Sequence, residues 1–283
     1  MLGSAVAGIA PSVLASAKSK NNTVTVLRNN IHQSACYWCY QSIPLDDFCA
    51  GLREIGLTAI DLLQPEQFPV AQKHGLYCPM CYGGDSGIYK GWSQGQYHET
   101  MIRNYTDKIP VVAKAGFRNV ICFSGIRNGM DDETGLRNCV KGLKKILPVA
   151  ERNNVIMVME LLNSKIDHHD YMCDHTAWGV ELCKRLDSEN FKLLYDIYHM
   201  QIMEGDIIRT ITENHQYIAH YHTGGVPGRH EIDNSQELFY PAVMRAILKT
   251  GFTGHVAQEF VPTPKDNAGK LEALEKCVKI CDV

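Results

Sequence analysis

Four polar side chains interrupt apolar runs of the chain near the point where each run ends. They are Glu160, Asp196, His222 and Glu259. A buried carboxylate is costly unless it is paired or coordinated, so three of them near one another need a shared counter-charge. A divalent metal ion supplies one, and this set of oxygens with one imidazole suits Mg²⁺, Mn²⁺ or Co²⁺, with Zn²⁺ as a further candidate. Each residue alone could instead cap a helix, pair with an arginine or make a core hydrogen bond, but together the four predict one metal site.

The elements that must position these residues follow from an alternation of short apolar runs with longer amphipathic ones. The strand-like runs are 31–40, 58–63, 76–82, 119–125, 155–162, 191–197, 217–223 and 254–260. The helix-like stretches are 44–55, 66–74, 98–115, 132–153, 175–186, 206–215, 240–250 and 268–280. Strand followed by helix eight times, with no Pro/Ser-rich linker, predicts an α/β fold, a single-domain (β/α)8 TIM barrel over residues 23–283.

In such a barrel the carboxyl ends of the strands meet at one face, where active sites are built. The four polar residues would therefore converge there. A doubly wound open sheet is the alternative fold, but no Gly-x-Gly-x-x-Gly turn follows the first strand-like run.

The first 22 residues differ from the rest in composition. Residues 2–17 carry no charge and end in Ala15-Ser16-Ala17, the small-x-small pattern of a signal cleavage site. A basic segment before this run is missing, and the run is too short and too rich in Gly and Pro to span a bilayer. We expect residues 1–22 to be a leader or a signal-peptide remnant. The protein would then be cytoplasmic, or periplasmic if residues 1–17 are the tail of an export signal.

The charge balance narrows the choice of partners. The chain has 28 Lys+Arg against 31 Asp+Glu, for a formal net charge of −3. Nucleic acid and anionic membranes normally recruit a basic face, so we expect neither as a partner. A small-molecule substrate is expected instead, and a homo-oligomer is left open.

Eleven cysteines are too few for a disulfide scaffold, and their odd number leaves at least one free. Two pairs, Cys36/Cys39 and Cys78/Cys81, have the spacing of a four-cysteine zinc site. We reject that site because both pairs lie in strand-like runs, where residues three apart point to opposite faces. Small buried apolar side chains are the preferred interpretation.

Four segments also carry specific motifs: 159–163 (MELLN), 195–200 (YDIYHM), 220–229 (HYHTGGVPGR) and 258–260 (QEF). Through them, essentially all of residues 23–283 resembles the hydroxypyruvate isomerase family, a branch of the xylose-isomerase-like barrels with ketose 3-epimerases as relatives. The resemblance implies that Glu160, Asp196, His222 and Glu259 hold the metal. It also implies that Glu160 and Glu259 flank the substrate as an acid/base pair.

Further residues are expected to contact the substrate. The resemblance implies that His199 contacts a substrate oxygen and that Arg229 binds near the substrate's other end; a helix-capping histidine and a surface salt bridge are the alternatives. The planar guanidinium of Arg229 suits a carboxylate or phosphate. Trp38 could wall the pocket or pack in the core, and Lys165 could reach the substrate from the loop after the fifth run.

The expected function is a metal-dependent isomerase that acts by proton transfer through an enediolate, on hydroxypyruvate (to tartronate semialdehyde) or a similar small hydroxy-carbonyl compound. Known hydroxypyruvate isomerases carry Gln where this chain has His222, whereas ketose epimerases carry His, so a ketose 3-epimerase or a sugar isomerase acting on a larger carbohydrate is the alternative. A noncatalytic sugar-binding barrel is the alternative of another class. DNA-repair endonucleases of a related barrel type need several zinc ions and a basic surface, which the net charge of −3 does not suggest.

Overall fold

The structure is a computed structural model that describes residues 26–84 and 87–283. The expected leader over residues 1–22, with the export segment at 1–17, lies outside the described residues.

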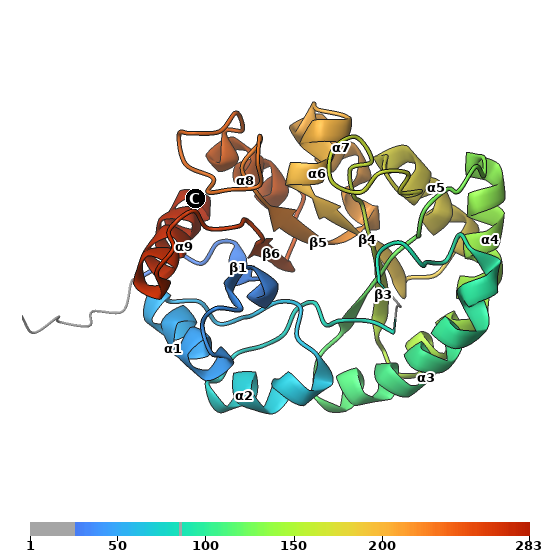
Figure 1. The fold of residues 1–283 in the computed structure, drawn as a ribbon, viewed down its shortest axis with the longest axis horizontal. Helices are drawn as coiled ribbons and strands as arrows, with labels where there is room; N and C mark the ends of the chain where they lie inside the picture. The colour runs from blue at the N-terminus through green and yellow to red at the C-terminus, as the bar shows by residue number, and fades with distance from the viewer. Residues whose placement is uncertain (1–25, 85–86) are drawn as a thin grey trace, which may run out of the picture.

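Six parallel strands form a sheet in the order β1-β6-β5-β4-β3-β2 (Figure 1). Their bounds are β1 His32–Ala35, β2 Asn119–Cys122, β3 Ile156–Glu160, β4 Phe191–Asp196, β5 Ile218–Thr223 and β6 His255–Gln258. Each strand lies inside a run that the sequence predicted, and all neighbours run parallel. The carboxyl ends of the strands therefore point the same way.

Two of the eight predicted strands, 58–63 and 76–82, are wrong as regular strands. They form only isolated parallel bridges, Cys36 with Asp61, Ala59 with Tyr77, Leu63 with Cys81 and Cys81 with Val120. Leu62 has a left-handed backbone, with φ of 60°, and Pro79 lacks the N–H that a ladder needs, so neither segment can continue as a strand. Through these bridges the two segments still link β1 to β2.

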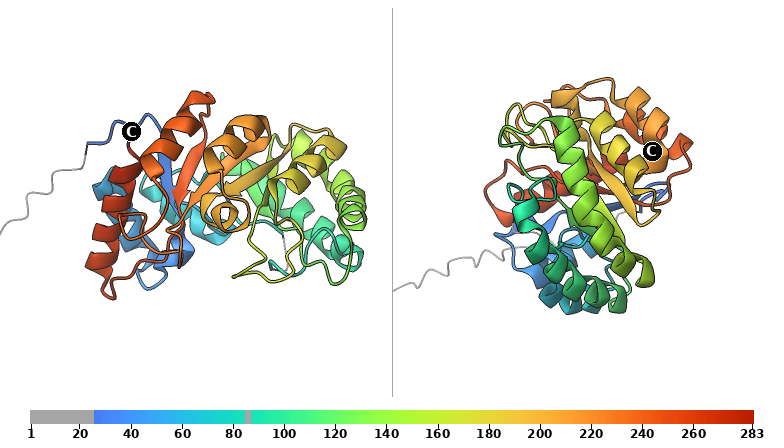
Figure 2. Two further views of the ribbon diagram at one scale, coloured as in Figure 1. Left: turned by 90° about the horizontal axis from the view of Figure 1, so that it is seen from above. Right: turned by 90° about the vertical axis from the view of Figure 1, so that its right-hand side faces the viewer.

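Helices lie on the outside of the sheet (Figures 1 and 2). Their bounds are α1 Leu45–Ile55, α2 Phe68–Lys73, α3 His98–Lys114, α4 Asp132–Arg152, α5 Thr176–Leu186, α6 Ile197–Met203, α7 Ile207–Asn214, α8 Tyr240–Lys249 and α9 Asn267–Cys281. Short 3₁₀ helices are η1 Tyr37–Tyr40, η2 Pro65–Gln67, η3 Gly95–Tyr97 and η4 His215–Tyr217. The predicted helices are confirmed, and α6 is an additional one. Among the described residues, no helix combines the length and apolar character needed to cross a bilayer.

The cysteines behave mostly as small core side chains, and all eleven are free thiols. The geometric reason given for rejecting a zinc site is wrong for one pair: Cys78 and Cys81 do not point apart, because their Sγ atoms are 3.6 Å from each other in the irregular segment around Pro79. Cys39 lies in η1 and not in a strand. Within the described ranges, no group of potential metal ligands contains Cys39, Cys78 or Cys81.

Candidate active site

The structure brings the four strand-end residues together. Glu160 and Asp196 are the last residues of β3 and β4, His222 lies on β5, and Glu259 directly follows β6. The register of β4 and β5 places Asp196 beside His222. One ligand atom from each of the four lies within 4.8 Å of those of the others, and all four residues are buried.

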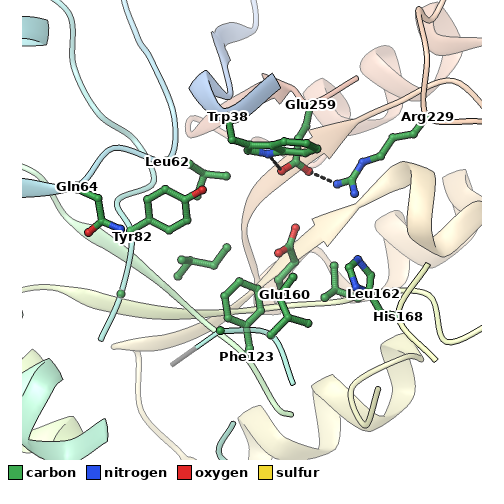
Figure 3. A pocket seen from close by; sticks show the side chains of 14 residues that line it. Trp38, Leu62, Gln64, Tyr82, Phe123, Glu160, Leu162, His168, Arg229 and Glu259 are labelled. Atoms are coloured by element: carbon green, nitrogen blue, oxygen red, sulfur yellow. Dashed lines mark hydrogen bonds and ion pairs between the residues drawn. The ribbon is translucent and has the colours of Figure 1, made fainter. Parts of the chain in front are cut away.

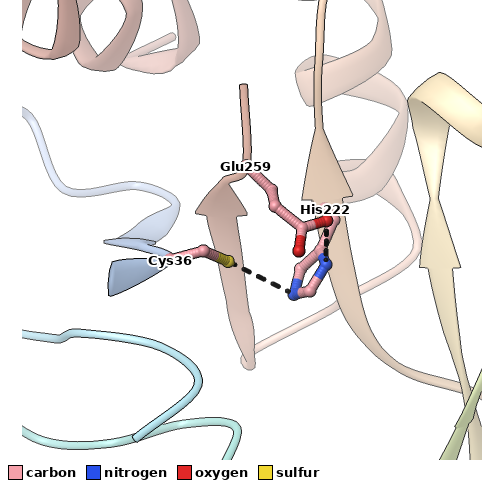
Figure 4. Close-up of side chains that lie close together, drawn as sticks. All are labelled: Cys36, His222 and Glu259. Atoms are coloured by element: carbon pink, nitrogen blue, oxygen red, sulfur yellow. Dashed lines mark hydrogen bonds and ion pairs between the residues drawn. The ribbon is translucent and has the colours of Figure 1, made fainter. Parts of the chain in front are cut away.

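His222 and Arg229 supply the positive groups that face the three carboxylates. His222 Nδ1 lies 2.7 Å from Glu259 Oε2 and 3.3 Å from Glu160 Oε1. Figure 4 shows this imidazole between the Glu259 carboxylate and the Cys36 thiol, whose Sγ is 3.8 Å from Nε2. Arg229 Nη2 donates to Glu259 Oε2 at 2.6 Å and to Asp196 Oδ2 at 3.3 Å.

The carboxylates differ in their electrostatic surroundings. Burial raises the pKa of Glu160, and it raises the pKa of Asp196 to about 8. Burial acts in the same direction on Glu259, but His222 and Arg229 outweigh it and hold the pKa of Glu259 well below its usual range. The cluster therefore contains carboxyl groups of unequal proton affinity.

A divalent metal ion fits this donor set. Three carboxylates with one imidazole are the ligands that such ions take in proteins. Glu160 Oε1 is buried, and its nearest charged group is the His222 imidazole, with Nδ1 at 3.3 Å, so this oxygen lies among the atoms that would surround an ion.

A cavity of about 490 Å³ opens onto the cluster (Figure 3). In Figure 3 the carboxylates of Glu160 and Glu259 point toward one another across it. Most of the remaining lining is apolar or aromatic, including Leu62, Phe123 and Leu162. The arrangement can hold a small polar molecule between two carboxylates.

Two predicted substrate contacts, Trp38 and Arg229, line this cavity. Trp38 lies in η1 and not at the end of a strand, and its Nε1 donates to Glu259 Oε1 at 2.7 Å. The Arg229 guanidinium lies 5.2 Å from the Trp38 ring and 5.4 Å from the Tyr198 ring. Both residues thus fix the Glu259 carboxylate as well as the cavity wall.

The other two predicted contacts are placed differently. Lys165 is not in the cavity lining; its Nζ donates to the carbonyls of Ile202 and Met203 at the end of α6. His199 is likewise not in the cavity lining; it is fully buried on α6, and its Nε2 is 3.6 Å from Asp196 Oδ2. The structure therefore brings His199 to the cluster and Lys165 to a helix end.

A buried pair behind His222, Asp61 with His220, was not predicted from the sequence. Asp61 Oδ2 lies 2.5 Å from His220 Nε2 and 3.5 Å from His222 Nε2, and none of the three side chains is exposed. His220 and His222 hold the pKa of Asp61 well below its usual range, although burial opposes them. The sequence did contain a signal for this pair. Asp61 interrupts an apolar run as the other carboxylates do, and His220 is two residues from His222 on the same strand face.

Residues 52–277 match the sequence model of the xylose isomerase-like TIM barrel family. The chain belongs to this family. It has the family's TIM-barrel fold, with six regular strands and two positions held by isolated bridges.

Among curated proteins, the chain is 29% identical over 137 residues to a putative hydroxypyruvate isomerase of Danio rerio, covering 48% of this chain and 49% of that protein. It is 32% identical over 120 residues to a 2-oxo-tetronate isomerase of Cupriavidus necator, covering 42% and 45%. The chain thus spans about half the length of these curated relatives.

Solved structures share the fold over more of the chain. An AP endonuclease, family 2, from Brucella melitensis superposes with a TM-score of 0.75 at 23% identity, covering 84% of this chain and 96% of that one. A D-psicose 3-epimerase with D-tagatose from Clostridium cellulolyticum H10 gives 0.72 at 18% identity, covering 89% and 100%. At such identities the likeness concerns the fold alone.

In this xylose isomerase-like barrel, Asp61→Ala is expected to lower the free energy of unfolding by about 3–5 kcal/mol, because His220 loses its buried partner. Urea denaturation measures the change. Asp46→Ala is the matched control: Asp46 pairs with Lys73 on the surface, and its loss should leave the midpoint nearly unchanged. If Asp61→Ala shifts the denaturation midpoint as little as Asp46→Ala does, the buried pair contributes little to stability.

The resemblance placed Arg229 near the substrate's other end, and the structure adds contacts of its Nη2 with both Glu259 and Asp196. Arg229→Ala should therefore raise KM and also lower kcat, each by about 10-fold or more, the effect of losing hydrogen bonds between charged groups. Steady-state kinetics separate the two constants. Arg209→Ala, on the exposed face of α7, is the control. A rise in KM with kcat unchanged would restrict Arg229 to substrate binding.

Proposed function

We propose that the protein is a metal-dependent isomerase that moves a proton on a small hydroxy-carbonyl compound, hydroxypyruvate being the first candidate. The observation that carries the proposal is the buried cluster of Glu160, Asp196, His222 and Glu259 at one end of a cavity. Family membership and the names of the curated relatives support the reaction class.

The four cluster residues would hold the ion. When bound, a divalent ion supplies Lewis-acid stabilisation of negative charge on substrate oxygens. Glu160 and Glu259 provide the proton transfer: one carboxylate removes a proton from the carbon beside the carbonyl, and the other group returns one. The Glu160 carboxylate lines the cavity and suits proton transfer, and Trp38 and Arg229 hold the Glu259 carboxylate in position.

Arg229 supports a substrate that carries a carboxylate, as hydroxypyruvate does, because its guanidinium lines the cavity beside Glu259 and Asp196. Return of the proton to the neighbouring carbon, with transfer of the hydroxyl proton to the former carbonyl oxygen, would give tartronate semialdehyde.

A ketose 3-epimerase or a sugar isomerase acting on a larger carbohydrate is the second candidate, favoured by His222 and by cavity size. Hydroxypyruvate has about seven non-hydrogen atoms, which fill roughly 210 Å³ even at the ~30 Å³ that one liquid water occupies. The cavity of about 490 Å³ leaves room for a longer chain of hydroxylated carbons. Return of the proton to the same carbon from the opposite face would invert its configuration.

Turnover of the Mn²⁺-loaded protein on hydroxypyruvate, fructose, tagatose and psicose tests both candidates. We expect measurable kcat/KM on at least one of them. A hydroxypyruvate value more than ~100-fold below that of the best sugar exceeds what a few mismatched pocket contacts explain and would transfer the proposal to the sugar. No turnover on any of them would favour a noncatalytic sugar-binding barrel.

A further inference from the structure

Asn163, just beyond the end of β3, uses its entire hydrogen-bonding capacity in a buried position. Its Oδ1 accepts from the backbone N–H of Ile166 at 3.0 Å and of Asp167 at 2.9 Å. Its Nδ2 lies 2.6 Å from Asp167 Oδ2 and 2.7 Å from His199 Nδ1. An amide has two acceptor sites and two N–H donors, so all four are engaged.

This pattern fixes the orientation of the amide. The oxygen and nitrogen of an asparagine side chain are assigned from their partners. Two backbone N–H donors require an oxygen on one side, and a carboxylate requires a donor on the other. Nδ2 therefore faces His199, and rotation of the amide would break three hydrogen bonds.

The tautomer of His199 follows from the donor that it faces. Because Asn163 Nδ2 donates, His199 Nδ1 must accept and carries no proton. The proton of the neutral imidazole is then on Nε2. That atom is buried, makes no hydrogen bond to any described residue, and lies 3.6 Å from Asp196 Oδ2 in the cluster.

We propose that Asn163 is a positioning residue that holds His199 as an Nε2–H donor, directed at an oxygen that the substrate places beside Asp196. The substrate group recognised there is a hydrogen-bond acceptor, a carbonyl, hydroxyl or carboxylate oxygen. This inference rests on the proposed function for the substrate, while the tautomer itself depends only on residues of the chain.

Asn163→Asp reverses the donor with almost no change of shape. The oxygen that accepts from Ile166 and Asp167 is kept, but the other position now accepts, so His199 must place a proton on Nδ1. The new carboxylate would also repel Asp167. The double variant Asn163→Asp/Asp167→Asn removes that repulsion, since the amide at 167 donates to the carboxylate at 163. The double variant keeps the hydrogen bond between the side chains at 163 and 167 and the net charge of the loop. His199 Nδ1 still faces the carboxylate at 163, which can only accept.

Asn190→Asp is the matched control. The Asn190 side chain donates to the carbonyl of Val155 at 2.7 Å, and it directly precedes β4, at the opposite end of that strand from Asp196. It undergoes the same chemical change without contact to His199.

Long-range ¹H–¹⁵N spectra of the metal-free protein, with His199 assigned through His199→Gln, report which ring nitrogen carries the proton. We expect Nε2 in the wild type and in Asn190→Asp, and a proton on Nδ1 in Asn163→Asp and in the double variant. A wild-type proton on Nδ1, or an unchanged His199 spectrum in the double variant, would overturn the proposal.

Steady-state kinetics with the best substrate of the turnover screen test whether His199 Nε2–H contacts a substrate oxygen. The double variant should lose about 10- to 100-fold in kcat/KM, the effect of one hydrogen bond to a charged or developing oxygen, with Asn190→Asp unchanged. An altered tautomer with unchanged kcat/KM would refute the substrate contact. Absence of wild-type turnover would contradict the proposed function, and the spectra would still decide the tautomer.

Discussion

Replacing either Glu160 or Glu259 by Gln is expected to lower kcat by about 10²–10⁴-fold, the contribution typical of a positioned acid or base. An amide keeps the shape of the carboxylate but cannot accept a proton from carbon. Both residues are buried, Glu160 at the end of β3 and Glu259 directly after β6, and Glu259 is held by Trp38 and Arg229, so the fold should tolerate the change.

Deuterium wash-in from solvent into substrate separates loss of proton transfer from loss of metal. Exchange should vanish in both variants at saturating Mn²⁺. Glu204→Gln is the matched control, because the Glu204 carboxylate accepts two hydrogen bonds from Thr176, at 2.6 and 2.7 Å, as a helix cap and has no contact with the cluster. If Glu160→Gln and Glu259→Gln both exchange at the wild-type rate, neither residue is the acid or base.

The helices were predictable because each carries its own periodicity and end signals. The helix expected over 44–55 is observed as Leu45–Ile55, and it ends at Gly56, whose φ of 96° needs a residue without a side chain. α6 was missed for the opposite reason. Its seven residues, Ile197–Met203, continue the apolar run of β4 without a turn signal. It begins because the Asp196 carboxylate accepts from the N–H of His199 at 3.1 Å, a contact that local pattern does not reveal.

The site was predictable where strand ends define it. Parallel strands bring their carboxyl ends to one edge, so Glu160, Asp196, His222 and Glu259 could be grouped without knowing a single distance. Residues that act through a partner remote in sequence could not be predicted in this way. Asp61 meets His220 across 159 positions, and Asn163 meets His199 across 36. Lys165 is a third case, since its amine donates to the carbonyls that end α6, a helix that was not predicted.

Asp196→Asn is expected to weaken the binding of one Mn²⁺ per chain by more than ~100-fold. Loss of a residue that only hydrogen-bonds to a metal ligand usually costs ~10–100-fold in affinity, and loss of a charged ligand should cost more. Asparagine can still cap α6, so the change removes a ligand charge and keeps the hydrogen bond to the His199 N–H. Three mutually close carboxylates favour a divalent ion more than two do, and the ion in turn stabilises the folded state that binds it.

Titration calorimetry with Mn²⁺ and the rise of Tm on adding it are two independent measures of this loss. The wild-type protein should bind one Mn²⁺ and show a higher Tm in its presence. Asp196→Asn should lose most of the Mn²⁺ affinity and most of this rise in Tm. Asp131→Asn is the matched control, because Asp131 caps α4 through the N–H of Thr134 and is exposed, away from the cluster. Equal affinity in Asp196→Asn and Asp131→Asn would remove Asp196 from the ligand set. The role of Asp196 would then be to cap α6 and to pair with Arg229.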